Sequence, residues 1–401
     1  MIIATLLVAV GLLVGAWAAT SRGYRLSGVV VVSLLALYTL VDFAALPVFA
    51  ASALLSYAAI GRIQDRWLLY GRPLLLAAVL VGALIPVGAI VVVELLVTGS
   101  IAVRHMDYVG TILPGIAAYN YYRAAPARRV PELAASAALF VGLLAIGVLS
   151  VLLWHYPPRI FHSLFGVTPA DYTWPLLLTN GADVAAVLGL PTVVGPEIVG
   201  SIGAVTLVVL AGLVVGETLR DRWGLVAAGV IALPLVALFA LRAWWVLPLY
   251  AGIFAVSYVA VEAIHRVTLL YGRALLSVAA TLGVLLGFPA IVAFGFTDGV
   301  TVFFAGLLAG IGAFNLHSTA PSERPAPLVV TTGSFVAIFA VARALVDPLP
   351  TGLATTVGIV EVAAAALVLG AAIWILVGYE AARPAEATLR EAAIPVEEVA
   401  R

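Results

Sequence analysis

The chain has 401 residues, of which 64% are hydrophobic and 10% are charged, and its formal net charge is zero. Soluble domains carry about a quarter charged residues, and apolar runs long enough to span a bilayer recur here, which predicts an all-α, polytopic helical membrane protein. The sequence contains no Cys and no Lys, which excludes disulfides, thiolate chemistry, a Walker A lysine and a Schiff-base lysine.

Hydropathy predicts six spans in the first part of the chain. The first run lacks a basic n-region and a cleavage site, so we expect a retained helix rather than a signal peptide. The weakly apolar stretch 155–200 follows the sixth span, and its Pro and aromatic residues predict an outer-face connector in the membrane interface. The six spans are 2–19, 26–41, 44–61, 73–97, 108–122 and 133–154.

Seven further spans follow, and a charged cytoplasmic tail, 379–401, ends the chain. Two of the thirteen spans, 108–122 and 301–316, are short and rich in Gly. We expect both to be full crossings, with re-entrant segments as the alternative. The later spans are 201–217, 225–241, 244–263, 274–296, 301–316, 328–346 and 354–378.

The arginines orient these spans in the membrane. If the loops after odd-numbered spans up to the eleventh lie on one side with the tail, that side holds sixteen of the twenty basic residues. Cytoplasmic loops carry an excess of basic residues. We therefore predict a protein of the plasma membrane with its N-terminus outside and its C-terminus in the cytoplasm.

An internal repeat relates the two halves of the chain. The five-residue motif LLYGR occurs at Leu68–Arg72 and again at Leu269–Arg273. At the same offset of 201, Gly, Pro, Tyr and Ser residues coincide without a gap, and a six-residue deletion brings Pro114–Asn120 onto Ala309–Asn315. Matches on Gly and Pro indicate shared backbone geometry rather than similar hydrophobicity alone. The chain is therefore a tandem duplication.

Each repeat has about six spans, an even number, so the two repeats run in the same direction through the membrane. We predict this domain organisation: 1–154 first repeat, 155–200 connector, 201–346 second repeat, 347–378 additional transmembrane helix, and 379–401 tail.

Each repeat resembles a whole protein of the PgsC/CapC family, the small membrane component of poly-γ-glutamate synthesis. The resemblance rests on Leu-Tyr-Gly-Arg between apolar helices, on LPGIAAYN at Leu113–Asn120, and on Gly216-Glu217. The family's Val-Pro-Gly-Tyr segment is missing. Ala309 replaces the motif Pro in the second copy, and Ala16 stands where Glu217 would fall in the first.

The resemblance implies a membrane subunit of a polymer synthesis and export complex, with membrane lipids around it. Its expected partners are an ATP-dependent amide ligase that joins glutamates, an export component and the polyglutamate chain, but no nucleic acid. Without Lys, this chain is not the ligase, so we expect no catalytic residue and no cofactor in it. The alternatives are a secondary transporter of a small anionic solute and a non-transporting membrane scaffold.

Arg and Tyr at the predicted cytoplasmic face are candidate contacts for an acidic partner or a polyanion. The alternative is that they are topology signals and interface anchors. The candidates are Tyr70, Arg72, Tyr271, Arg273, Arg129 and Arg324.

The short Gly-rich spans suggest a second group of candidates. Pro114 is expected to kink or break its helix, which would free backbone groups along a path. Close helix packing through Gly is the alternative. The candidate path-lining or kink residues are Pro114, Gly115, Asn120, Gly310 and Asn315.

Glu361 falls inside the last predicted span, and Arg343 falls in the span before it. An acidic residue in a membrane is costly and is a functional candidate by default. We expect Glu361 to be protonated or to pair with Arg343, while Asp347 follows Arg343 by four and predicts a local pair. The five His residues show no metal-ligand spacing, and we expect no metal site.

Overall fold

The computed structural model of the chain describes residues 2–28, 30–96, 109–155, 182–188, 202–225, 229, 231–294 and 299–381. Every regular element in these residues is an α-helix, since a segment in lipid must satisfy its backbone hydrogen bonds internally. The helices are α1 (Ile2–Arg22), α2 (Val31–Val41), α3 (Ala45–Trp67), α4 (Arg72–Leu96), α5 (Val109–Tyr122), α6 (Pro126–His155), α8 (Asp183–Val187), α9 (Ile202–Trp223), α10 (Ala232–Arg242), α11 (Val246–Thr268), α12 (Gly272–Phe294), α13 (Gly299–His317), α14 (Pro325–Leu345) and α15 (Ile359–Ala381).

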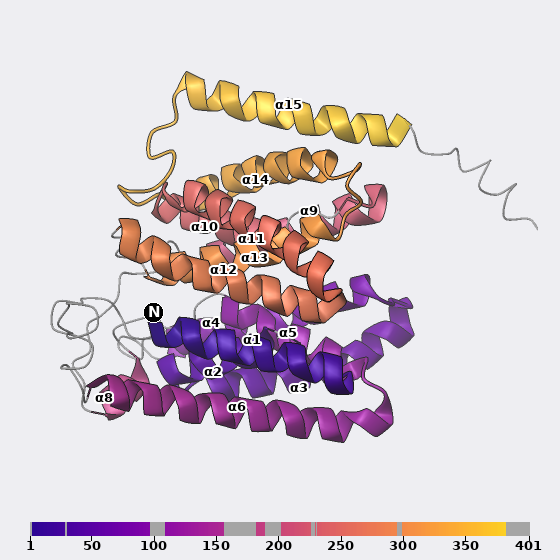
Figure 1. Cartoon of the computed structure of the whole chain (residues 1–401). Coiled ribbons are helices and arrows are strands. Elements are labelled where there is room, and N and C mark those ends of the chain that lie inside the picture. Colours follow the sequence, from indigo (N-terminus) through magenta and orange to yellow (C-terminus); the bar gives the residue numbers. More distant parts are fainter. Residues whose placement is uncertain are drawn as a thin grey trace, which may run out of the picture.

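The helices form two bundles that follow the sequence repeat. In Figure 1, α1 to α6 lie in the lower half of the molecule and α9 to α15 lie in the upper half. Equivalent helices pack alike: α3, α4 and α5 contact one another as α11, α12 and α13 do. Likewise α2 packs on α6 as α10 packs on α14. The predicted duplication is therefore confirmed in three dimensions.

The two bundles meet through reciprocal helix contacts. The first helix of each repeat touches the fourth helix of the other, α1 against α12 and α9 against α4. The contact between α1 and α12 is the more extensive of the two. This pattern is what a two-fold relation between same-direction repeats produces.

Two helices are shorter than the predicted spans 26–41 and 225–241. Both α2 and α10 have 11 residues, which reach about 16 Å at 1.5 Å per residue, against a hydrocarbon core of about 30 Å. Leu26, Ser27 and Gly28 adopt positive φ angles, so the helix cannot begin before them. These helices are too short to cross the hydrocarbon core by themselves, so a crossing by the two segments stays a prediction. They are apolar because protein surrounds them.

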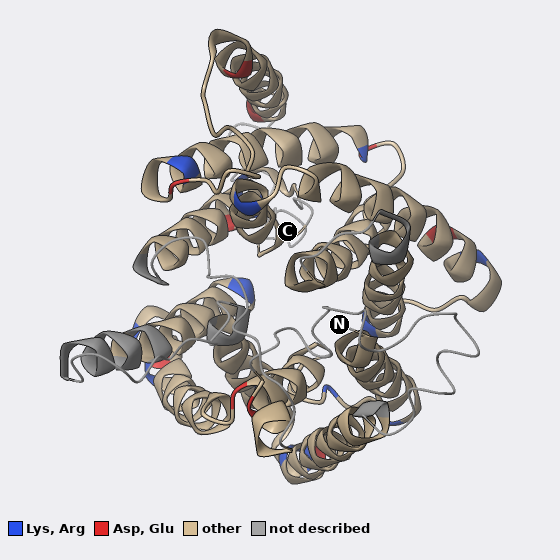
Figure 2. Cartoon of the chain, turned by 90° about the vertical axis from the view of Figure 1, so that its left-hand side faces the viewer, with Lys and Arg blue, Asp and Glu red and all other residues tan. Residues whose placement is uncertain are grey.

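Eight helices in the described residues are long and apolar enough to cross a membrane: α1, α3, α6 and α11 to α15. Figure 2 looks along the helices and shows how sparse charged residues are on them. The chain is therefore a multi-pass membrane protein. Helix α13, one of the two short predicted spans, belongs to this set. Helix α5 has 14 residues, and residues 97–108 before it lie outside the described residues, so its crossing stays a prediction.

Glycines bring the fourth and fifth helices of each repeat into backbone contact. A Cβ atom on Gly115 would fall on the Ala78 carbonyl of α4, and one on Gly310 would fall on the Ala279 carbonyl of α12. Small residues allow this close approach between membrane helices. The same contact in both repeats explains why these glycines match at the repeat offset.

The segments outside the repeats attach to the bundles at their edges. In the predicted connector, α8 docks through the Asp183 carboxylate, which accepts a hydrogen bond from the Phe43 amide at 2.9 Å. The remaining parts of 155–200, and the tail beyond residue 381, lie outside the described residues. Helix α15 packs on α14, where a Cβ on Gly333 would touch Ala372, and Ala372 is its one buried residue.

Candidate functional site

Two loops of the same conformation carry the LLYGR motif. Helices α3 and α11 both end before a Leu with left-handed backbone, Leu68 at φ 51° and Leu269 at φ 54°. Gly71 and Gly272 follow with φ angles of 66° and 59°, which favour glycine because a side chain is strained there. The motif therefore encodes one turn twice. Both loops lie at the end of the molecule where α1, α3, α9 and α11 finish, which we call the arginine-rich end.

The polar side chains of the motif lie at the surface of this end. Tyr70 and Tyr271 are 62% and 81% exposed. Arg72 approaches Glu217 of α9, with 4.0 Å between Nη1 and Oε1. Arg273 instead lines a cavity beside the end of α1. Each motif arginine thus faces the first helix of the other repeat.

Arg129, a candidate contact for a partner, makes its hydrogen bonds within its own repeat. Its guanidinium donates to the Tyr57 hydroxyl at 3.2 Å and to the carbonyls of Tyr122 and Ala124 at 3.0 and 3.1 Å. These bonds join α3 to the turn between α5 and α6. Arg324 makes the equivalent set in the second repeat. Both residues therefore have a structural function in the turn.

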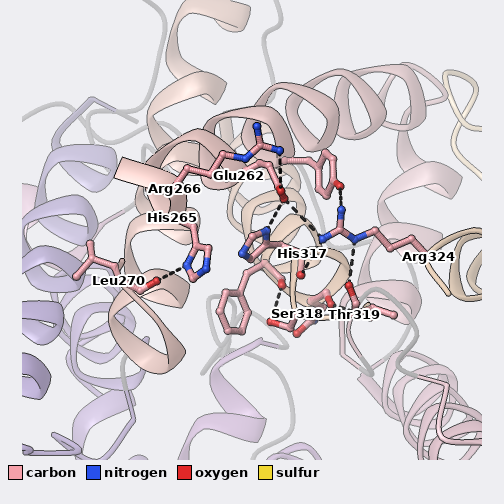
Figure 3. Close-up of polar contacts among 11 residues, drawn as sticks. Glu262, His265, Arg266, Leu270, His317, Ser318, Thr319 and Arg324 are labelled. Atoms are coloured by element: carbon pink, nitrogen blue, oxygen red, sulfur yellow. Dashed lines mark hydrogen bonds and ion pairs between the residues drawn. The ribbon is translucent and has the colours of Figure 1, made fainter. Parts of the chain in front are cut away.

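The second repeat adds an ionisable cluster at this position (Figure 3). His317 Nδ1 of α13 lies 2.7 Å from Oε2 of Glu262 on α11. Arg324 lies 3.6 Å from the same oxygen, and Arg266 donates to Oε1 at 3.3 Å. We call Glu262, Arg266, His317 and Arg324 the Glu262 cluster. A carboxylate held by one histidine and two arginines can yield the arginines to a competing anion.

His265 connects the Glu262 cluster to the second LLYGR loop. Its Nδ1 lies 2.7 Å from the Leu270 carbonyl oxygen. Its ring also meets the His317 ring edge-on, with 4.9 Å between centroids. Figure 3 shows the two imidazoles side by side between the loop and the carboxylate. The loop and the cluster therefore form one connected unit.

The first repeat has uncharged residues in place of Glu262 and of both histidines. Tyr122 donates to Gln64 at 2.7 Å in place of the two histidines, and Gly61 stands in place of the carboxylate. Tyr119 holds the first LLYGR loop by donating to the Gly71 carbonyl at 2.6 Å. The two repeats thus stabilise the same loop by different chemistry.

The Glu262 cluster was not predicted, because the five His residues show no metal-ligand spacing in the sequence. The signal lay in the register of the repeat. His317 falls on Tyr122 at the offset of 195, and Glu262 and His265 lie one helical turn apart. Within the described part of the chain, no group of three or more His, Asp or Glu side chains is arranged to hold a metal ion.

The candidate path-lining residues support packing and turns. The Asn120 amide donates to the Ile116 carbonyl at 3.0 Å and lies 3.5 Å from the Ser27 carbonyl, so it covers the turn before α2. Asn315 occupies the same place in the second repeat. Pro114 lies inside α5, which continues across it, so the helix does not break there and the kink stays a prediction. Gly115 and Gly310 make the backbone contacts described above, which support the packing interpretation.

Glu361 and Arg343 do not form the predicted intramembrane pair. Glu361 lies in the first turn of α15, where its carboxylate accepts the Gly358 amide at 3.0 Å. Arg343 pairs with Asp347 at 3.3 Å, as their spacing predicts, and donates to the Ala354 carbonyl at 3.2 Å. The helix begins later than the predicted span, so the carboxylate lies at its positive end rather than at mid-depth.

A family model described as capsule biosynthesis CapC matches the chain twice, over residues 10–130 and 211–324. The two segments together cover more than half of the chain and fall on the two helix bundles. Each segment contains one LLYGR loop, one short buried helix and one arginine-held turn. No curated protein and no solved structure matches the chain.

Proposed function

Because the chain belongs to the capsule biosynthesis CapC family, we propose that it is the membrane subunit of a complex that makes and exports poly-γ-glutamate. A role in capsule biosynthesis follows from the family itself. The observation that carries the proposal further is the double match on a duplicated fold, since each repeat resembles the whole membrane component of that synthesis.

The bond-forming chemistry belongs to a separate subunit in this proposal. Joining glutamates through their side-chain carboxyls needs ATP, and an ATP-dependent amide ligase needs a nucleotide site. This chain has no Lys for a P-loop. It therefore anchors the ligase, guides the product, or does both, together with an export component.

The arginine-rich end is the proposed docking side for the ligase. Sixteen of the twenty arginines belong to the predicted cytoplasmic loops and tail, and both LLYGR loops lie at this end of the bundle. The proposed placement is the plasma membrane, with the N-terminus outside and the ligase bound from the cytoplasm.

Deletion of the gene tests the proposal. We expect the deletion strain to lose secreted poly-γ-glutamate and to regain it on complementation with the intact chain. The ligase should copurify with the tagged protein, and an adjacent ligase gene would agree with this. Unchanged secretion of the polymer in the deletion strain would refute the proposal.

The Glu262 cluster favours one alternative, a secondary transporter of a small anionic solute. A histidine hydrogen-bonded to a carboxylate is suited to moving protons, and same-direction repeats occur in transporters. Reconstituted protein would then take up an organic anion when a pH gradient is imposed. Absence of such uptake from proteoliposomes, beside loss of polymer in the deletion strain, would favour the polymer complex.

A further inference from the structure

The two junctions between the repeats are equivalent in position but differ in charge. At one junction, Arg72 faces Glu217 at 4.0 Å. Arg220 lies in electrostatic range of Arg72, Glu217 and Asp221, so two arginines meet two carboxylates. A cavity of about 510 Å³ beside this junction is lined by Glu217, Asp221 and Arg222. Arg222 pairs with Glu380 at 2.9 Å, so positive and negative charges are balanced here.

The other junction lacks this balance. Arg273 occupies the place of Arg72, but the position of Glu217 is taken by Ala16 on α1. Arg25 and Arg123 act on Arg273 electrostatically, and so does one carboxylate, Glu132. Around Arg273, arginines therefore outnumber carboxylates.

A cavity of about 550 Å³ opens at this second junction. The end of α1 with residues 23–25 forms one wall, and the second LLYGR loop forms the other. Arg25 and Arg273 are the charged side chains among the described residues that line it, and none of these lining residues is acidic. We call this cavity the Arg25–Arg273 pocket.

We propose that the Arg25–Arg273 pocket binds carboxylate groups of the acidic polymer chain. Guanidinium forks bind carboxylates with two parallel hydrogen bonds, and an anion between two arginines relieves their mutual repulsion. The pocket has the size of a small-molecule site, enough for a short stretch of polymer. This inference rests on the proposed function and deepens it, because it assigns polymer contact to Arg273 and not to Arg72.

Binding of a fluorescent γ-linked glutamate oligomer tests the assignment directly. The intact protein is placed in nanodiscs of phosphatidylcholine, and the oligomer is titrated by fluorescence anisotropy at low salt. We expect Arg25→Gln/Arg273→Gln to weaken binding by about tenfold or more, because two charge-assisted contacts are lost. The same change at the equivalent position, Arg72→Gln, should alter the affinity by less than about twofold. Equal affinities of the double variant and the wild type would overturn the proposal.

A second pair of variants covers the case in which the double variant does not fold. Ala16→Glu supplies the carboxylate that the first repeat lacks, so it should compensate Arg273 and weaken oligomer binding. Ala16→Gln adds similar bulk without charge and should bind as the wild type does. If Ala16→Glu and Ala16→Gln bind the oligomer equally well, the charge of the pocket does not govern binding and the proposal fails.

Two further titrations distinguish the polymer from other anions that the pocket could bind. Inorganic phosphate and nanodiscs containing phosphatidylglycerol are compared as competitors for the oligomer. If only phosphatidylglycerol is bound in a manner that depends on Arg25 and Arg273, the pocket is a lipid headgroup site and the polymer assignment is overturned. This readout needs no polymer synthesis, so its failure is distinct from unchanged secretion in the deletion strain.

Discussion

Arg324 repeats each hydrogen bond of Arg129. Each guanidinium donates to a tyrosine hydroxyl on the third helix of its repeat and to the carbonyls five and seven residues before it. The geometry is kept although Arg324 also faces Glu262 and Arg129 has no such neighbour in its own set of contacts. Because the same hydrogen bonds form in different surroundings, we infer that these arginines fix the turn before the sixth helix of each repeat.

Replacing Arg129 by Gln should destabilise the first repeat. The change removes three donors to partly buried acceptors, and hydrogen bonds from charged groups contribute about 2 kcal/mol. We expect a lower midpoint of thermal unfolding in detergent, followed by size-exclusion chromatography. Arg128→Gln is the matched control, because Arg128 is exposed beside it. Equal midpoints for the two variants would show that the turn does not depend on these bonds.

The histidine pair of the second repeat should be replaceable by the pair of the first. His317→Ala removes the bond to Glu262 and should cost about 1 kcal/mol of stability. His265→Gln/His317→Tyr introduces the Tyr–Gln hydrogen bond seen at 2.7 Å in the first repeat, so it should recover most of that loss. A double variant as unstable as His317→Ala would mean that the second repeat cannot form the Tyr–Gln hydrogen bond of the first repeat.

The sequence was sufficient for the helices and the repeat, because their signals are local or periodic. Apolar runs mark helices wherever backbone bonds must be satisfied internally, and Gly71 with Gly272 marks a turn that needs positive φ. The lengths of α2 and α10 were overestimated, because hydropathy does not show the positive φ angles, at Gly28 and Gly229, that precede these helices.

The site was harder to predict, since its residues meet only through the fold. Glu262 and His317 lie 55 positions apart, and their contact depends on how α11 packs on α13. The surroundings of Arg72 and Arg273 differ in charge because each arginine faces the first helix of the other repeat. Glu361 was misplaced because the helix start was set a few residues too early, and the error moved its carboxylate from a helix end to mid-membrane.

Adding a methyl group to Gly310 should disturb the second bundle. Its Cβ would meet the Ala279 backbone, and overpacking of this kind costs about 1–3 kcal/mol. Gly252→Ala on α11 is the control, because a Cβ there meets nothing within 4 Å. Thermal unfolding of the two variants should separate them clearly. If both unfold as the wild type does, α12 and α13 can move apart at no cost.

Cysteine labelling should reveal which side of the membrane holds the arginine-rich end. The chain has no Cys, so single substitutions give unique labels. We expect Asp347→Cys to react with an impermeant maleimide in intact cells, and Arg66→Cys to react only after permeabilisation. Both native side chains are exposed, so access is not limited by burial. The reverse pattern would invert the predicted orientation.

The reciprocal contacts between the first helix of one repeat and the fourth helix of the other have a consequence for how such proteins assemble. A chain with a single repeat could bring a first helix onto a fourth helix of another repeat only by pairing with a second copy, and that pair would be symmetric. Joining the copies in one polypeptide fixes their stoichiometry at one to one and lets each half mutate alone. Ala16 and Glu217 illustrate the outcome: the interface with Glu217 has an ion pair with Arg72, and the interface with Ala16 has no carboxylate at that position.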